Sequence, residues 1–395
     1  TVVGLVPEDE DHAAFLTMSF GAAGALLGVA AGSLLSLAYL ALRFRIHGDG
    51  TPPRLYRQSP PARSAKEIRR QLWAVTLPIA LGSLTTNAAG LIDATILQSR
   101  VGSAIAMDPR RFLSACGERL PQEYAANLQA VPTYLYGCYT LAMTIALLVP
   151  GITQAFGTSA LPTVTAAWAK GGRKELRARM EAVVRVTSLF CFPAGLGIVA
   201  LADPIARLLY GSAPSVPLIG EALAVLGIAS IASAMSGPLS SVLQAVGRAD
   251  LPVKLLLGAV ALKLGITWVL CGIPEVHVLG AGVAALASYG FLVVSQLWCM
   301  RRVTGIPFST VSVLLRPLAC ALLCAMSART VYEFLTPMVP GGRGWQGGVL
   351  GISVVFGGIL YIAGLLLLKG IPKSELASLP MGQKIVKMLE KQGWI

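Results

Sequence analysis

Nine long apolar segments dominate this 395-residue sequence and restrict the chain to one kind of environment. A helix needs about 20 apolar residues to cross roughly 30 Å of hydrocarbon at about 1.5 Å per residue. Transmembrane β-strands would instead show about ten residues of alternating polarity, which this sequence lacks. We therefore predict an all-α polytopic membrane protein. The nine predicted spans are 14–42, 72–97, 133–154, 183–207, 218–243, 253–273, 278–300, 311–335 and 347–368.

The composition agrees with lipid as the solvent. Apolar residues make up 55% of the chain and charged residues 13%, against about 45–50% and about 25% in soluble domains. Proline and glycine recur inside the predicted spans, as at Pro193 and Pro238. Membrane helices tolerate these residues where neighbouring groups satisfy the freed backbone.

The basic residues indicate the orientation of the spans. The chain has 32 Lys and Arg against 19 Asp and Glu, a net charge of +13. Connections on one side of the predicted spans hold 23 of the basic residues, and connections on the other side hold seven. Because cytoplasmic loops are enriched in Lys and Arg, we predict a cytoplasmic carboxy-terminus and an amino-terminal end outside. The positive charge then reports topology, and nucleic acid is not an expected partner.

Two segments outside the spans have compositions of their own. Residues 44–70 are basic and proline-rich, which favours a cytoplasmic linker and makes contact with anionic lipid headgroups one interpretation. Residues 370–395 mix apolar and lysine side chains, as in a basic amphipathic helix lying on the membrane surface, and a frayed tail is the alternative. The chain starts at Thr1 with acidic residues 8–11 and no basic signal region, so we expect further chain upstream.

Ionisable and polar side chains inside membrane spans are costly, and each is therefore a functional hypothesis. Lys263 lies at the centre of span 253–273 and should face a water-filled cavity or pair with a carboxylate or a substrate phosphate. Asp93 lies near the predicted outer end of its span, where exposure is expected. It follows Gly82, Thr86 and Gly90 at helical spacing, and this stripe predicts close helix packing or a cavity wall.

Other candidates are less central. Asn87 lies beside the stripe and is a candidate for bonding to substrate or to a neighbouring helix. Arg316 is near the cytoplasmic end of its span, where its side chain should reach the interface. Gln154 is near a cytoplasmic helix end. The sequence has no metal-ligand spacing, no phosphate-binding loop and no paired catalytic carboxylates, so we predict neither an enzyme nor a cofactor or metal.

Six segments carry a resemblance to a known family, in the same order along the chain. They are 157–162, 166–169, the basic run 170–179, 202–211, 239–248 and 280–284. Their sequences and spacing are similar to those of oligosaccharide-lipid flippases in the multidrug/oligosaccharidyl-lipid/polysaccharide exporter superfamily. The strongest likeness is to the stage V sporulation protein B branch, which is related to lipid II flippases.

The resemblance implies a fourteen-helix fold, of which this chain would hold the sixth helix onward. Residues 1–43 would be an external segment plus the last helix of the amino-terminal lobe, and 44–70 the inter-lobe linker. Residues 71–369 would form the eight-helix carboxy-terminal lobe, followed by the tail 370–395. The last two spans, 311–335 and 347–368, would form the apolar groove attributed in the family to a polyprenyl tail.

The function implied is a flippase of the bacterial plasma membrane for lipid-linked peptidoglycan or polysaccharide precursors, with spore cortex as one setting. Its partners would be a polyprenyl-pyrophosphate oligosaccharide and cell-wall synthesis proteins. We interpret Lys263 as attracting phosphate, with Asn87 and Thr86 contacting sugar. One alternative is a drug/cation antiporter using Asp93, and another is a non-transporting scaffold for cell-wall assembly.

Overall fold

The computed structural model describes residues 10–48, 64–116, 119–121, 124, 127–306, 311–339 and 342–367. Most of the predicted linker and the whole predicted tail 370–395 lie outside these residues, as does the side chain of Thr86. The chain divides into two compact units, residues 1–70 and 71–395. Helix α3 begins in the first unit and continues into the second.

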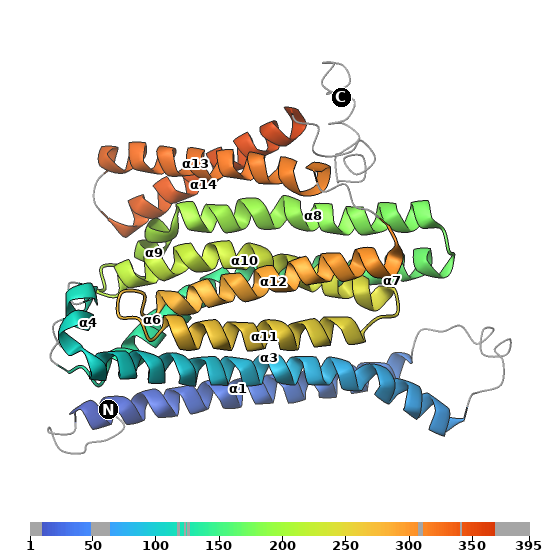
Figure 1. Ribbon diagram of the computed structural model, residues 1–395, viewed down its shortest axis with the longest axis horizontal. Coiled ribbons are helices and arrows are strands. Elements are labelled where there is room, and N and C mark those ends of the chain that lie inside the picture. The colour runs from blue at the N-terminus through green and yellow to red at the C-terminus, as the bar shows by residue number, and fades with distance from the viewer. Residues whose placement is uncertain are drawn as a thin grey trace. The chain divides into compact units, whose positions relative to one another are not determined.

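All regular structure in the described residues is helical (Figure 1). The helices reach into the predicted linker from both sides, because α1 ends at His47 and α3 begins at Ala65. The long helices are α1 (Glu10–His47), α3 (Ala65–Met107), α6 (Val131–Ala146), α7 (Leu148–Ala169), α8 (Arg173–Ala200), α10 (Val216–Ala245), α11 (Asp250–Leu270), α12 (Leu279–Thr304), α13 (Arg316–Leu335) and α14 (Arg343–Leu367). The short ones are α4 (Pro109–Cys116), α9 (Ala202–Tyr210), the π-helix η3 (Val311–Leu315) and the 3₁₀ turn η4 (Thr336–Met338).

Eight stretches of described helix are long and apolar enough to cross a membrane, and they overlap eight of the nine predicted spans. This confirms a multi-pass helical membrane protein. The remaining predicted span, 72–97, lies within the 43-residue helix α3. It is not among the eight, so the total of nine stays a prediction.

One predicted span ends at a different residue from the helix in the structure. The predicted span 183–207 is wrong at its end, because α8 stops at Ala200 and the separate helix α9 begins at Ala202. Pro204 has no N–H to donate to the carbonyl of Ala200, and the helix is interrupted at Leu201, the residue directly after that carbonyl. Counting apolar residues does not detect such a break.

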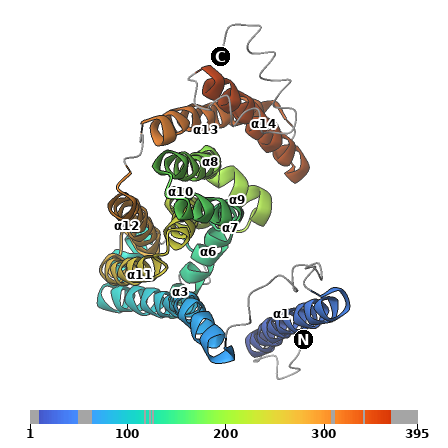
Figure 2. The ribbon, with the colours of Figure 1, turned by 90° about the vertical axis from the view of Figure 1, so that its right-hand side faces the viewer.

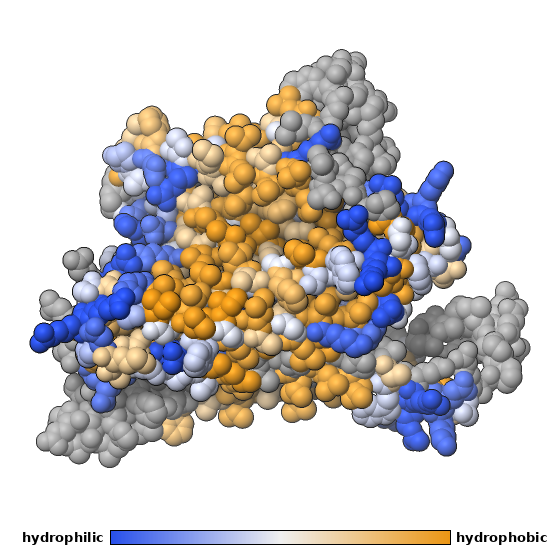
Figure 3. Space-filling model, in the orientation of Figure 1, coloured by the Kyte–Doolittle hydropathy of each residue, from blue (hydrophilic) through white to orange (hydrophobic). Residues whose placement is uncertain are grey.

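Helix α10 occupies the centre of the 71–395 unit. Figure 2, viewed along the helices, shows it between α8, α12 and α6. Two apolar clusters meet along its length: the first half packs with α6 and the end of α3, and the second half packs with α7, α8 and α13. Over α8, α10 and α12 the surface in Figure 3 is apolar in the middle and hydrophilic toward the helix ends, as a bilayer requires.

Proline inside α10 leaves a backbone acceptor that a neighbouring helix satisfies. Pro238 cannot donate to the carbonyl of Ala234, four residues earlier. The hydroxyl of Thr153 on α7 donates to that carbonyl oxygen over 2.8 Å, and Thr153 is fully buried. This hydrogen bond joins α7 to α10 at the point where α10 loses its own.

The same arrangement links α14 to α8. Pro193 inside α8 leaves the carbonyl of Leu189 without its helical donor. The hydroxyl of Tyr361 on α14 donates to the Leu189 oxygen over 2.8 Å. In hydrocarbon no water replaces a missing donor, so this bond both repairs α8 and fixes the position of α14.

A third case joins α8 to the start of α13. Pro317 in the first turn of α13 cannot donate to the carbonyl of Val313 in η3. The hydroxyl of Ser188 donates to the Val313 oxygen over 2.7 Å, and Ser188 is fully buried. Local π-helical adjustment is one way in which membrane helices accommodate backbone groups that a proline leaves unpaired. The sequence therefore supplies a hydroxyl on the adjacent helix at each of these three prolines.

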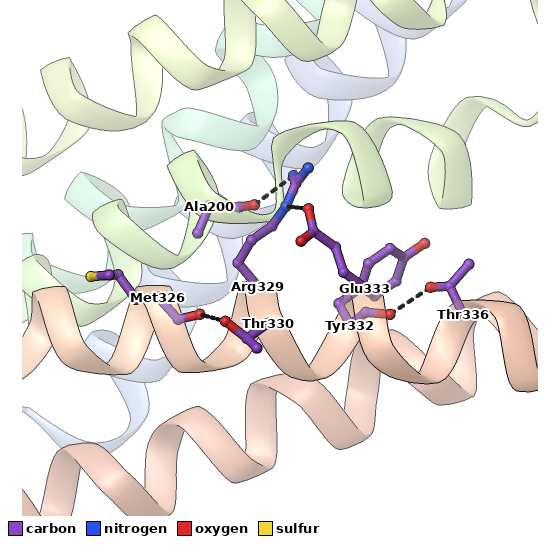
Figure 4. A network of polar contacts seen from close by, with 7 residues as sticks. All are labelled: Ala200, Met326, Arg329, Thr330, Tyr332, Glu333 and Thr336. Carbon is purple, nitrogen blue, oxygen red and sulfur yellow. Dashed lines mark hydrogen bonds and ion pairs between the residues drawn. The ribbon is translucent and has the colours of Figure 1, made fainter.

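A guanidinium performs this task at the end of α8 (Figure 4). Pro204 has no N–H to donate to the carbonyl of Ala200. That carbonyl accepts a hydrogen bond from Arg329 Nη1 of α13 over 3.1 Å instead. Arg329 Nε also pairs with Glu333 one turn later at 2.5 Å. A cation at a helix carboxyl end is favourable because the free carbonyls there carry partial negative charge. Arg329 thus holds α13 against α8.

We predict that the Tyr361–Leu189 bond is coupled to Pro193. Tyr361→Phe should reduce the free energy of unfolding by about 1 kcal/mol, a typical value for hydrogen bonds between membrane helices. In a Pro193→Ala background the restored N–H satisfies Leu189, so Tyr361→Phe should cost much less. A double-mutant cycle of stability in detergent measures this coupling. Equal costs of Tyr361→Phe in both backgrounds would contradict the assignment.

The connection between α11 and α12 holds a buried histidine with an unusual backbone. His277 is 1% exposed, its Nδ1 has no partner among the described residues, and its φ is +38°. Burial and the nearby positive charge of Arg119 lower the pKa of His277 from 6.5 to about 4. The folded state therefore holds this imidazole neutral over a range in which the unfolded chain protonates it.

This difference predicts how stability changes with pH. Between pH 6.5 and about 4 the unfolded state binds a proton that folded His277 does not bind. Stability should therefore be complete above pH 6.5 and fall as the pH approaches 4. His277→Asn, which tolerates positive φ, should flatten this slope in thermal unfolding followed at several pH values. An unchanged slope in the variant would assign the effect to other groups.

Candidate functional site

A chamber of about 460 Å³ lies among α3, α7, α10, α11 and α12. Its lining combines apolar residues with neutral hydrogen-bonding groups, and none of the described residues that line it is charged. Such a wall can bind hydroxyl and amide groups without paying to desolvate an ion. The polar lining consists of Gln154, Ser233, Ser236, Ser240, Gln244, Tyr289 and Gln296.

Helix α10 contributes a continuous polar stripe to this chamber. Ser233, Ser236, Ser240 and Gln244 recur at intervals of three and four residues, which places them on one face of the helix. The buried apolar residues of α10 occupy its other faces and pack in the two clusters described above. The central helix therefore anchors the core with one side and lines the chamber with the other.

Gln296 on α12 has unused hydrogen-bonding capacity. Its residue is 0% exposed, and its Nε2 donates to Ser240 Oγ over 2.8 Å. Its Oε1 is buried and has no partner among the described residues. An unsatisfied buried polar atom costs roughly 1–3 kcal/mol. A ligand hydroxyl or amide donor in the chamber could remove that cost.

Gln154 reaches the chamber from α7 because Gly237 makes room for it. The Oε1 atom of Gln154 lies so close to Gly237 that a Cβ there would overlap it. Any side chain at this position would displace the carboxamide or separate α7 from α10. Gly237 is therefore needed here because its missing side chain leaves space for the Gln154 carboxamide.

A buried ion pair lies next to the chamber. Lys263 Nζ of α11 is 2.7 Å from Asp93 Oδ2 of α3, and the two side chains are 15% and 7% exposed. Thr267, one turn after Lys263, donates its hydroxyl to Asp93 Oδ1 over 3.3 Å. Lys263 also borders a small cavity of about 20 Å³, room for about one water molecule. Ser233 and Tyr289 line both this small cavity and the chamber.

The contacts show that α3 and α11 run in the same direction. Asp93 meets Lys263, and farther along both helices Arg100 Nε donates to the carbonyl of Trp268 over 3.0 Å. The Arg100 guanidinium also lies 4.4 Å from the centre of the Trp268 ring. The predicted topology has the same parallel order. Three spans lie between 72–97 and 253–273, and because successive spans alternate in direction, these two cross the membrane in the same direction.

The structure corrects one predicted environment and explains another. The expectation that Asp93 is exposed near the end of its helix is wrong, because α3 continues to Met107 and buries Asp93 against α11. Of the environments predicted for Lys263, the structure shows pairing with a carboxylate, that of Asp93. Burying either charge alone would cost several kcal/mol, so each stabilises the other.

The remaining candidates separate into two groups. Gln154 lines the chamber, and so does Gly82, the first residue of the predicted α3 stripe. Asn87 and Arg316 are exposed and do not line the chamber, although both make other contacts. Arg316 is the first residue of α13. The environment of the Thr86 side chain lies outside the described part of the chain.

Sequence reasoning missed the α10 serines, Tyr289 and Gln296. The three-to-four spacing of the serines was a usable signal, because it matches one face of a helix. Tyr289 and Gln296 lie seven residues apart in a mostly apolar span, which also places them on one face. What the sequence did not reveal was that both faces meet at the same cavity.

These features define a multi-pass helical membrane protein with a polar chamber among its helices. Residues 130–341, more than half of the chain, match the family model described as lipid II flippase MurJ. The chain belongs to this family. All the lining residues of the chamber except Gly82 fall within the matched region, as does Lys263.

Individual relatives are more distant. The chain is 23% identical over 376 residues to stage V sporulation protein B of Bacillus subtilis (strain 168), covering 94% of this chain and 65% of that protein. A solved lipid II flippase MurJ in an inward closed conformation aligns with a TM-score of 0.47 and 14% identity, covering 60% of this chain and 48% of that one. A MOP superfamily transporter from Pyrococcus furiosus aligns at 0.40 with 13% identity, covering 74% and 62%.

We predict that Lys263 and Asp93 act as a pair in stability. Lys263→Met leaves a buried carboxylate without a partner and should lower the free energy of unfolding by roughly 3–5 kcal/mol. Asp93→Leu should cost a similar amount, because it leaves the ammonium alone. The double variant should recover most of the loss in thermal unfolding in detergent. A double variant as unstable as the two losses added together would refute the pairing.

Proposed function

We propose that this chain belongs to a flippase that moves lipid-linked peptidoglycan or polysaccharide precursors across the bacterial plasma membrane, with its carboxy-terminus in the cytoplasm. The observation that carries the proposal is the uncharged, hydrogen-bonding chamber within the region matched by the flippase family model. A spore cortex precursor is the finer version of the proposal, supported by the sporulation relative.

The chamber suits the part of such a substrate that lipid cannot accommodate. Sugars present many hydroxyl and amide groups, each of which loses hydrogen bonds when it leaves water. Hydroxyls from α10 and carboxamides from α7 and α12 replace those bonds while the prenyl chain stays in lipid. Movement of helical lobes about such a site would alternate its access between the two sides of the membrane.

Gln154 and Gln296 are the sugar-binding residues in this proposal, with Asn87 and Thr86 as further candidates. The free Oε1 of Gln296 accepts a hydrogen bond from a sugar hydroxyl or amide. Lys263 attracts phosphate only when it leaves Asp93, since its ammonium is paired in the arrangement seen here. Phosphate recognition is therefore linked to opening of that ion pair.

The same ion pair weighs against a drug/cation antiporter. Such an antiporter needs an intramembrane carboxylate to bind its coupling cation, and Asp93 is the residue predicted for that task. Here the Lys263 ammonium lies 2.7 Å from that carboxylate and supplies its positive charge. A scaffold without transport would have no need for the chamber's unpaired acceptor, so a transport assay separates the two classes.

The test is translocation of a fluorescent lipid-linked oligosaccharide by the whole protein to which this chain belongs, reconstituted in liposomes. Gln154→Leu and Gln296→Leu should each reduce the translocation rate by about fivefold, because a lost hydrogen bond to substrate is worth about 1 kcal/mol. Ser288→Ala is the matched control. It removes a buried hydroxyl of α12 that bonds within its own helix and does not line the chamber.

The outcomes of this assay distinguish the proposed functions. Loss of translocation in both glutamine variants, with normal thermal stability and an active control, supports the chamber as the substrate route. Normal translocation in both variants refutes the chamber assignment. Complete absence of translocation by the unmodified protein, together with normal cell-wall protein binding, would favour the scaffold.

A further inference from the structure

A second large recess lies on a different side of α12. Its volume is about 760 Å³, and its walls come from α8, α12 and η3. The walls are apolar along most of their length and end at two arginines in the last turn of α12. The lining residues are Val184, Val294, Leu297, Trp298, Arg301, Arg302, Val313 and Leu314.

The recess and the chamber use opposite faces of the same helix. Gln296 faces the chamber, whereas Val294 and Trp298, two positions to either side, face the recess. Two residues along an α-helix correspond to a rotation of about 200°. Since the helix itself separates the two spaces, a molecule in the recess does not lie in the chamber.

The recess faces the lipid side of the helix. Val294 is 67% exposed and Trp298 57% exposed, and Phe291 precedes them on the same face at 42%. This apolar row leads directly to Arg301 and Arg302. Tryptophan at the boundary between an apolar surface and a charged group is the usual arrangement at a membrane interface.

The two arginines present positive charge that no carboxylate neutralises among the described residues. Neither Arg301 nor Arg302 forms an ion pair there, although other arginines at helix ends, such as Arg177 and Arg248, do. The Arg302 guanidinium lies 4.9 Å from the centre of the Trp298 ring, which holds it at the mouth of the recess. Guanidinium groups match phosphate oxygens in charge and in hydrogen-bonding geometry.

We propose that this recess binds one anionic glycerophospholipid, such as phosphatidylglycerol. The phosphate lies between Arg301 and Arg302, and an acyl chain follows Val294 and Leu297 along the apolar wall. Charge complementarity selects an anionic headgroup, and the adjoining exposed apolar row selects a lipid over a free anion. The site does not depend on the proposed transport function, because it lies outside the chamber.

A lipid in the recess contacts three elements, α8, α12 and η3. α8 and η3 are already joined by the Ser188–Val313 hydrogen bond, and the recess extends from Val313 to α12. A lipid bound in the recess therefore contacts both α12 and the segment that leads into α13. We expect the lipid to stabilise this junction.

The experiment measures lipid binding to the purified, delipidated full chain by native mass spectrometry. Phosphatidylglycerol and phosphatidylcholine with identical acyl chains are titrated separately. Phosphatidylglycerol should bind about tenfold more tightly, and Arg301→Gln/Arg302→Gln should reduce its affinity to that of phosphatidylcholine. The matched control is Arg173→Gln/Lys174→Gln, which removes two exposed basic residues of α8 that do not line the recess.

A second variant tests the apolar wall without changing charge. Val294→Trp fills the recess at an exposed position, so folding should be preserved, and phosphatidylglycerol affinity should fall about tenfold. Unchanged affinity in this variant or in the arginine double variant overturns the site. Equal losses in the Arg173/Lys174 control would show nonspecific charge attraction and also overturn it. Displacement of the lipid by millimolar inorganic phosphate would mean that a free anion is the ligand, contrary to the proposal.

Discussion

The structure depends on how helices satisfy backbone carbonyls in a solvent without hydrogen-bond donors. Proline recurs inside the membrane segments, and each internal proline removes the N–H that would pair with the carbonyl four residues earlier. In water that carbonyl would be solvated, but in hydrocarbon it must find a protein donor. At Pro238, Pro193 and Pro317 a hydroxyl from an adjacent helix supplies the donor.

Each carbonyl that a proline leaves unpaired therefore forms a hydrogen bond to another helix. The donors lie on α7, α14 and α8, so the three bonds tie together helices that are far apart in sequence. Arg329 adds a fourth connection at the end of α8. Because apolar contact alone gives little preference for helix over lipid, such directional bonds specify which helix lies beside which.

Polar groups near the membrane centre follow a similar rule with different consequences. Asp93 and Lys263 satisfy each other and leave almost no accessible charge, whereas Gln296 keeps an unpaired oxygen beside a cavity. The first arrangement fixes α3 against α11, and the second provides an acceptor for a ligand. Helix α12 separates this polar chamber from the basic, apolar recess on its other face.

The sequence alone determined the membrane environment, the approximate spans and the alternation of the connections, because apolar length and loop charge are local properties. It also indicated Lys263 and Gln154 as candidate site residues, because polar groups are costly inside membrane spans. Only the tertiary structure decided that Asp93 is buried, that α8 ends at Ala200, and that serines of α10 meet Gln296 across a chamber. A hydropathy pattern identifies which residues are polar, but the partner of each depends on which helix faces meet. That choice is made by close packing and by donors that compensate for prolines elsewhere in the chain.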